Sequence, residues 1–272
     1  MLADEGFHIP IVTTLHGTDI TLVGSHPFYR PAVTFSINHS DRVTAVSESL
    51  KQDTLRLFEI TTKIDVITNF IDIKKIEAKE MPCKRDLLAP KSDKIITHIS
   101  NFRPLKRIQD VIKIFEKILS TVPSKLLMVG EGPEKQKAMD YVKEKGLTES
   151  ISFLGNSNEI DKILCYSDLF LLPSEKESFG LSALEAMANK VPVISSNAGG
   201  IPEVNKDDFS GYLSDVGDLD GMAKNALGLL QDDIKLKQFK EQAKEQASLF
   251  DIDAIISQYE AVYSEAIAAH HF

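Results

Sequence analysis

From residue 94 onward, short apolar segments alternate with longer amphipathic segments. Segment 94–99 is rich in β-branched residues, and in segment 108–121 the apolar side chains recur every three or four positions. The first pattern is typical of a buried strand, and the second of a helix with one apolar face. Because apolar strands separated by helices form parallel sheets covered on both faces, we expect an α/β fold with a doubly wound domain. The alternation repeats through strand candidates at 125–129, 151–154, 169–172, 191–195 and 211–213 and helix candidates at 134–145, 159–165, 181–188, 234–247 and 252–268.

The first 75 residues show a similar but shorter pattern. Strand candidates at 10–15, 42–46 and 63–67 and a helix candidate at 49–58 indicate a second parallel sheet. An open α/β domain usually has about five or six strands, so we expect residues 1–75 to be a partial N-terminal domain of a truncated chain. Residues 76–93 are expected to be a linker, residues 94–250 a complete C-terminal domain, and residues 251–272 a helix that packs back toward the N-terminal domain.

Composition excludes several classes of protein. The chain of 272 residues has 31 Lys and Arg against 40 Asp and Glu, a net charge of −9, which argues against nucleic-acid binding. Hydrophobic residues make up 43%, too many for a disordered chain. The 2 cysteines do not make a disulfide framework, so reduced thiols are expected. No apolar run approaches the roughly 18 residues of a membrane span. We therefore expect a globular protein of the cytoplasm.

Polar residues and glycines gather in loops that follow the strand candidates. In open α/β sheets, ligands bind at these loops, outside the carboxyl ends of the strands. Glycine and proline in two of the loops could equally make simple strand-to-helix turns. Arg103, Lys106 and Arg107 would oppose the dipole of the helix they precede, so we expect an anion beside them, with a solvated helix start as the alternative. The five loops are 16–19, 100–107, 130–133, 174–181 and 197–203.

Glu177 and Glu185 flank the most specific motif, because segment 179–181 lies between them and leads from a loop into a helix. Gly180 allows the backbone to approach a ligand closely, and the first free amides of the helix can bind a phosphate. Carboxylates on the two sides of that phosphate can accept hydrogen bonds from hydroxyl groups. This layout suits a sugar nucleotide, which has hydroxyl groups on both sides of its diphosphate.

These residues, with segments 199–203 and 16–19, resemble the retaining GT-B glycosyltransferases of the glycogen-synthase and sucrose-synthase type. The resemblance implies a GT-B fold, here with a complete C-terminal Rossmann-like domain and a partial N-terminal one. Further segments are similar to the transferases that move N-acetylglucosamine from UDP-GlcNAc to L-malate, the first step of bacillithiol synthesis, with retention at the anomeric carbon. We thus expect UDP-GlcNAc and L-malate as partners, and a homodimer. We expect no metal ion or other cofactor. The segments are 13–21, 43–47, 69–72, 98–103 and 174–181.

The resemblance also implies roles for single residues on the donor side. Glu177 should hydrogen-bond the hydroxyls of the donor sugar, and Glu185 those of the ribose. Lys106 matches a lysine that binds the diphosphate, and His16 matches a histidine that contacts the donor sugar. The expected catalytic residues are therefore His16, Lys106 and Glu177.

Other donor contacts follow the same motifs. Asn101 stands where the family usually has an arginine, so Arg103 is expected to supply the second cation. Asn156 follows a strand where the uracil base would meet backbone groups. The junction between sugar and phosphate should be lined by Ser178, Phe179, Gly180 and Leu181.

The acceptor side has fewer candidates. Malate is a dianion, and a chain of net charge −9 has to bind it through a local positive group. Arg30 is the only arginine ahead of Arg42, so we expect it near the acceptor carboxylates, with Thr18 as a hydroxyl partner; a solvated loop arginine is the alternative. A transferase of another sugar or acceptor, and a sugar-nucleotide-binding module without turnover, are the alternative functions.

Overall fold

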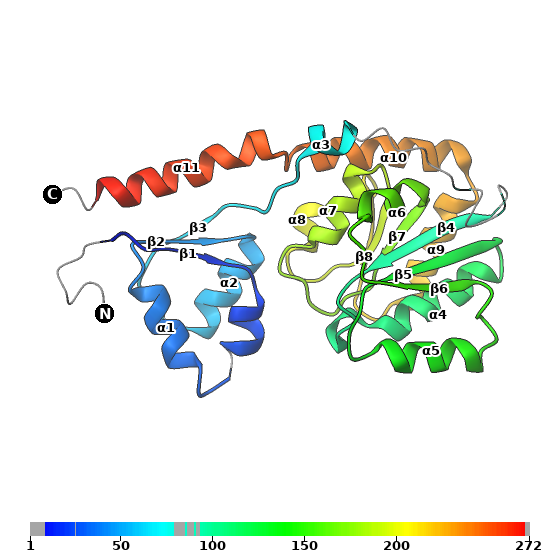
Figure 1. The fold of residues 1–272 in the computed structure, drawn as a ribbon, viewed down its shortest axis with the longest axis horizontal. Helices are drawn as coiled ribbons and strands as arrows, with labels where there is room; N and C mark the ends of the chain where they lie inside the picture. Colours follow the sequence, from blue (N-terminus) through cyan, green and yellow to red (C-terminus); the bar gives the residue numbers. More distant parts are fainter. Residues whose placement is uncertain (1–8, 25, 79–84, 86–89, 91–92, 270–272) are drawn as a thin grey trace. The chain divides into compact units, whose positions relative to one another are not determined.

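The computed structural model describes residues 9–24, 26–78, 85, 90 and 93–269 (Figure 1). The chain divides into two compact units, one of residues 1–70 with 250–272 and one of residues 71–249. The boundaries expected from the sequence lay after residues 75 and 250.

The larger unit contains a six-stranded parallel sheet with the strand order β6-β5-β4-β7-β8-β9. The order reverses at β4, because β5 and β6 lie on one side of it and β7, β8 and β9 on the other. The loops after β4 and β7 therefore flank a topological switch point, where open α/β sheets bind their ligands. The strands are β4 (Lys94–Ile99), β5 (Ser124–Val129), β6 (Ile151–Gly155), β7 (Leu169–Leu172), β8 (Val193–Ser196) and β9 (Gly211–Ser214).

Helices pack on both faces of this sheet (Figure 1). Leu126 and Met128 of β5 join one core with α4 and α9, whereas Leu127 and Val129 join another with α6. Side chains of a strand alternate between its faces, so the apolar strands expected from the sequence are confirmed as strands buried on both sides. None of the described helices combines the length and the apolar character that a membrane span needs. The helices are α3 (Ile73–Glu77), α4 (Ile108–Leu119), α5 (Lys135–Glu144), α6 (Ile160–Tyr166), α7 (Leu181–Ala188), α8 (Ile201–Val204), α9 (Leu219–Leu230) and α10 (Asp233–Ser248).

The smaller unit contains three parallel strands in the order β1-β2-β3. The expected strands and the expected helix at 49–58 are present, while α1 is a helix that the sequence did not predict. The elements are β1 (Val12–Leu15), a π-helical turn (Asp19–Val23), α1 (Arg30–Asn38), β2 (Arg42–Ala45), α2 (Glu48–Leu57) and β3 (Ile64–Val66).

The C-terminal helix α11 (Ile252–Ala268) packs on this small sheet. Tyr259 of α11 is buried against Ile67, which follows β3, and its hydroxyl donates a hydrogen bond of 3.2 Å to the Ile67 carbonyl oxygen. Arg42 at the start of β2 and Glu265 of α11 form an ion pair of 3.5 Å. The C-terminal helix therefore belongs to the smaller unit, although the chain reaches it only after the whole of the larger unit.

The structure corrects one expectation about the cysteines. Cys165 of α6 is disulfide-bonded rather than reduced. The other cysteine of the chain, Cys83, lies outside the described residues.

Candidate active site

Lys106 and Glu177 form an ion pair at the switch point of the larger sheet. Lys106 ends a short 3-10 helix (Pro104–Lys106) in the loop after β4, and Glu177 lies in the loop after β7. Their side chains are only 16% and 10% exposed. The structure thus places in direct contact the residue expected to bind a diphosphate and the residue expected to bind sugar hydroxyls.

Glycines allow other segments to pack tightly against the Glu177 loop. A Cβ atom on Gly199, whose φ is +58°, would lie 1.9 Å from the Glu177 carbonyl oxygen, and one on Gly200 would lie 2.3 Å from that of Ser178. The Gly200 amide also donates a hydrogen bond of 2.9 Å to the Glu177 carbonyl oxygen. Segment 197–203 is therefore both the entry to α8 and a support for the candidate site.

Helix α7 begins beside Glu177 with a residue that cannot cap it. Gly180 occupies the N-cap position with φ of +99°, and no side chain caps the helix there. The first amides of α7 are therefore suited to binding an anion. Phe179 is buried, whereas Leu181, the first residue of α7, is exposed. The expected place of 178–181 at a sugar–phosphate junction stays a prediction.

The loop after β4 is held by the loops after β5 and β6. Phe102 is buried with φ of +38°, and its carbonyl oxygen accepts a hydrogen bond of 3.0 Å from the Glu134 amide. The Gly130 amide in turn donates to the Gly155 carbonyl oxygen at 2.8 Å. Asn156 follows Gly155 and is exposed. The loop 130–133 is thus a tight corner that supports the loop carrying the candidate cations.

The three cations of the β4 loop have different surroundings. Arg107 binds the Asp110 carboxylate within the first turn of α4, with Nε at 2.6 Å from Oδ2. Arg103 is exposed and has no ion pair within the described part of the chain. Arg107 also lies 3.9 Å from the Glu175 carboxylate, so it links the start of α4 to the loop after β7, whereas Lys106 is the cation in contact with Glu177.

His98, a residue that the sequence analysis did not assign, links β4 to β7. Its Nδ1 lies 2.8 Å from the Leu171 carbonyl oxygen, and its Nε2 lies 2.8 Å from Ser100 Oγ. A carbonyl oxygen only accepts, so Nδ1 carries the proton and Nε2 accepts from the serine. Burial lowers the pKa of His98 to about 4, which keeps the ring neutral in this arrangement. A polar residue inside an apolar strand was the available signal in the sequence.

Glu185 lies on α7, two turns after the Glu177 loop. Burial raises the pKa of its carboxyl group to about 7, and the charge of Asp161 on α6 adds to the shift. The expected contact of Glu185 with the ribose hydroxyls stays a prediction.

The candidates of the smaller unit follow β1. His16 and Thr18 are exposed in the loop after β1, where Gly17 has φ of +121° and its amide donates a hydrogen bond of 2.7 Å to Asp19 Oδ1. Arg30 begins α1; its guanidinium donates to the Leu57 carbonyl oxygen and lies 5.8 Å from the centre of the Phe58 ring. Arg30 thus has partners within its own unit, and its expected acceptor role stays a prediction.

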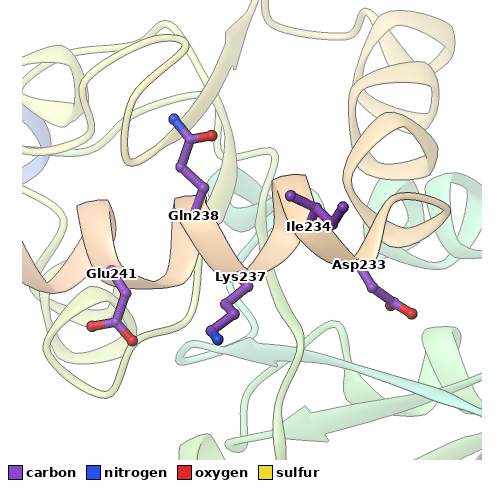
Figure 2. Close-up of a pocket in the computed structure, with 5 residues that line it drawn as sticks. All are labelled: Asp233, Ile234, Lys237, Gln238 and Glu241. Atoms are coloured by element: carbon purple, nitrogen blue, oxygen red, sulfur yellow. The ribbon is translucent and has the colours of Figure 1, made fainter.

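A surface pocket on α10 contains none of the expected site residues. Asp233, Ile234, Lys237, Gln238 and Glu241 line it, all from one helix (Figure 2). Asp233 pairs with Lys94 at 2.6 Å, so the pocket lies near the amino end of β4, opposite the switch point. Among the residues that the structure describes, no group of His, Cys, Asp and Glu could hold a metal ion.

Comparison with known proteins decides the family. The family model for glycosyl transferases group 1 matches residues 83–246, more than half of the chain. The chain belongs to this family. The model for glycosyltransferase family 4 matches residues 2–75.

The relatives of this glycosyltransferase include enzymes of known name. N-acetyl-alpha-D-glucosaminyl L-malate synthase of Bacillus anthracis is 44% identical over 96% of this chain, which spans 69% of that protein. Poly(ribitol-phosphate) alpha-N-acetylglucosaminyltransferase of Staphylococcus aureus is 29% identical over 76% of this chain, which spans 40% of it.

Solved structures confirm the expected GT-B fold. Sucrose-phosphate synthase of Thermosynechococcus elongatus superposes with a TM-score of 0.85 at 21% identity. The match covers 98% of this chain and 70% of the synthase chain. HepE of Anabaena, solved in complex with UDP-glucose, matches 94% of this chain and 72% of its own with a TM-score of 0.81 at 22% identity.

The raised pKa of Glu185 predicts a particular pH dependence of stability. The folded protein holds the Glu185 proton more tightly than the unfolded chain, so this group contributes stability below about pH 4.5 that is lost as pH rises through about 7. Glu185→Gln cannot lose a proton. The free energy of unfolding of the variant, relative to the native protein, should therefore rise by up to about 3 kcal/mol between pH 4 and pH 8.

Urea unfolding across that pH range measures the difference. The matched control is Glu144→Gln, which changes an exposed carboxylate at the end of α5. If the free energies of unfolding of Glu185→Gln and Glu144→Gln depend on pH in the same way, the pKa of Glu185 is not raised by burial.

Proposed function

We propose that this glycosyltransferase moves N-acetylglucosamine from UDP-GlcNAc to the hydroxyl group of L-malate, with retention at the anomeric carbon. The observation that carries the proposal is the contact of Lys106 with Glu177 at the switch point. It supports the proposal because Lys106 is the cation proposed for the diphosphate and Glu177 is the carboxylate proposed for the sugar hydroxyls. The name of the Bacillus anthracis relative supports this choice of sugar and acceptor.

On the donor side, Lys106, Arg103 and the first amides of α7 bind the diphosphate. Glu177 accepts hydrogen bonds from the hexose hydroxyls, Glu185 accepts them from the ribose, and the backbone around Asn156 contacts the uracil. The charge on the departing UDP grows as the bond from the anomeric carbon to the phosphate oxygen breaks. Preorganised cations and amides stabilise such a charge most strongly. In this mechanism no metal ion is required, so EDTA should leave the rate unchanged.

On the acceptor side, we propose Arg30 as the group that binds a malate carboxylate, with Thr18 as a hydroxyl partner. His16, in the loop after β1, is proposed to contact the donor sugar. One N–H group of Arg30 is used by the Leu57 carbonyl oxygen, and a guanidinium has five to offer. A homodimer and a cytoplasmic location stay predictions.

A transfer assay tests the function as a whole. With UDP-GlcNAc and L-malate, the protein should release UDP and form a GlcNAc–malate glycoside whose anomeric proton has the α configuration by NMR. Transfer to malate from UDP-glucose but not from UDP-GlcNAc would indicate another sugar. Binding of UDP-GlcNAc without any product would indicate the binding module.

Lys106→Ala tests the diphosphate contact. Because a charge-assisted hydrogen bond is lost, the dissociation constant of UDP should rise about tenfold or more. Isothermal titration calorimetry measures it. The control is Lys113→Ala, which removes another lysine of the same region, on α4, whose side chain is 42% exposed. An unchanged UDP affinity in Lys106→Ala would exclude Lys106 from the donor site.

Arg30→Gln tests the acceptor contact. The apparent KM for malate should rise about tenfold, while the KM for UDP-GlcNAc stays within twofold, because only the acceptor loses a charged partner. Arg56→Gln is the control in the same unit, since the Arg56 side chain is 73% exposed and pairs with Asp53. If both KM values move together, or neither moves, Arg30 does not bind the acceptor.

A further inference from the structure

The two carboxylate oxygens of Glu177 have different surroundings. Oε1 is bound by Lys106 Nζ and also by the hydroxyl group of Ser174, which donates a hydrogen bond of 3.0 Å. Within the described part of the chain, Oε2 has no hydrogen-bond partner. One oxygen is therefore held by the protein, and the other is left to accept hydrogen bonds from a ligand.

Ser174 is itself held on two sides. It follows β7 by two residues and is completely buried. Its carbonyl oxygen accepts a hydrogen bond from the hydroxyl group of Ser196, the last residue of the neighbouring strand β8. The hydroxyl that binds Glu177 thus projects from backbone that two adjacent strands of the sheet fix in place.

We propose that Ser174 is a positioning residue for recognition of the hexose. Together with Lys106, it holds Oε1 of Glu177 so that Oε2 faces the hydroxyl groups of the donor sugar. This inference rests on the proposed function, because it assigns the hexose to Glu177. It adds a difference between the two residues. Lys106 contacts both the diphosphate and Glu177, whereas Ser174 contacts Glu177 alone.

This difference predicts which measurements change when the hydroxyl group of Ser174 is removed. In Ser174→Ala, Glu177 keeps its charge and its contact with Lys106 but loses the hydrogen bond that restricts rotation of its side chain. Preorganised groups lose effect when their supporting hydrogen bonds are removed. The kcat/KM for UDP-GlcNAc should therefore fall. The affinity for UDP should stay unchanged, because UDP has no hexose. A purely structural role would weaken both together.

The experiment compares Ser174→Ala with Ser167→Ala. Ser167 is also a buried serine, at the opposite end of β7, where its hydroxyl bonds Thr97 and the Ile163 carbonyl oxygen. In Ser174→Ala, kcat/KM for UDP-GlcNAc should fall about tenfold or more while the dissociation constant of UDP stays within twofold. In Ser167→Ala, stability should fall but both constants should stay within twofold of the native values.

A double-mutant cycle completes the test. In the Glu177→Ala background, which removes the acceptor of the Ser174 hydrogen bond, Ser174→Ala should reduce the remaining kcat/KM by less than threefold. Full additivity of the two substitutions, or a rise in the UDP dissociation constant that parallels the loss of turnover, would overturn the inference. If the native protein and Ser174→Ala turn over UDP-GlcNAc equally well, the inference is overturned but the proposed function is not. Native protein without any turnover would overturn both this inference and the proposed function.

Discussion

The ion pair of Lys106 with Glu177 depends on the topology of one parallel sheet. The strand order reverses at β4, so β4 and β7 are hydrogen-bonded neighbours although they are far apart in the sequence. The loops that follow these two strands therefore start side by side. The loops after β4 and β7 thus flank the reversal at the carboxyl edge, which is where open α/β sheets bind their ligands. His98 ties the strands together through the Leu171 carbonyl oxygen and Ser100, directly before the loops separate. The contact that carries the proposed donor site therefore depends on this strand order.

The proposed donor site has to bind an anion although the protein is acidic. The net charge of −9 repels a diphosphate over long distances, so binding has to come from groups at contact distance. Lys106 faces Glu177, which neutralises part of its charge, and the amides of α7 add dipoles that carry no counter-charge. Glu185 remains partly protonated near neutral pH, since burial raises its pKa to about 7.

Much of the larger unit could be predicted from the sequence, because its periodicity directly reflects burial. The helix expected at 134–145 is Lys135–Glu144, and the glutamates expected to flank a helix start do so around Gly180. Helix α1 was missed because only one of its residues, Ile37, is buried, so the helix lacks a wide apolar face. The contact of Ser174 with Glu177 is local, at a spacing of three residues in one loop, but the burial of Ser174 and its bond from Ser196 on the next strand cannot be read from that spacing. Arg30 shows the same limit, since its partner Leu57 is 27 residues away.

The most direct test of the central claim is a crystal structure of the protein with UDP-GlcNAc bound. The account predicts the diphosphate within hydrogen-bond distance of Lys106 Nζ and of the first amides of α7, and a hexose hydroxyl on Oε2 of Glu177. A diphosphate bound elsewhere, with the contact between Lys106 and Glu177 shielded from the ligand, would contradict it.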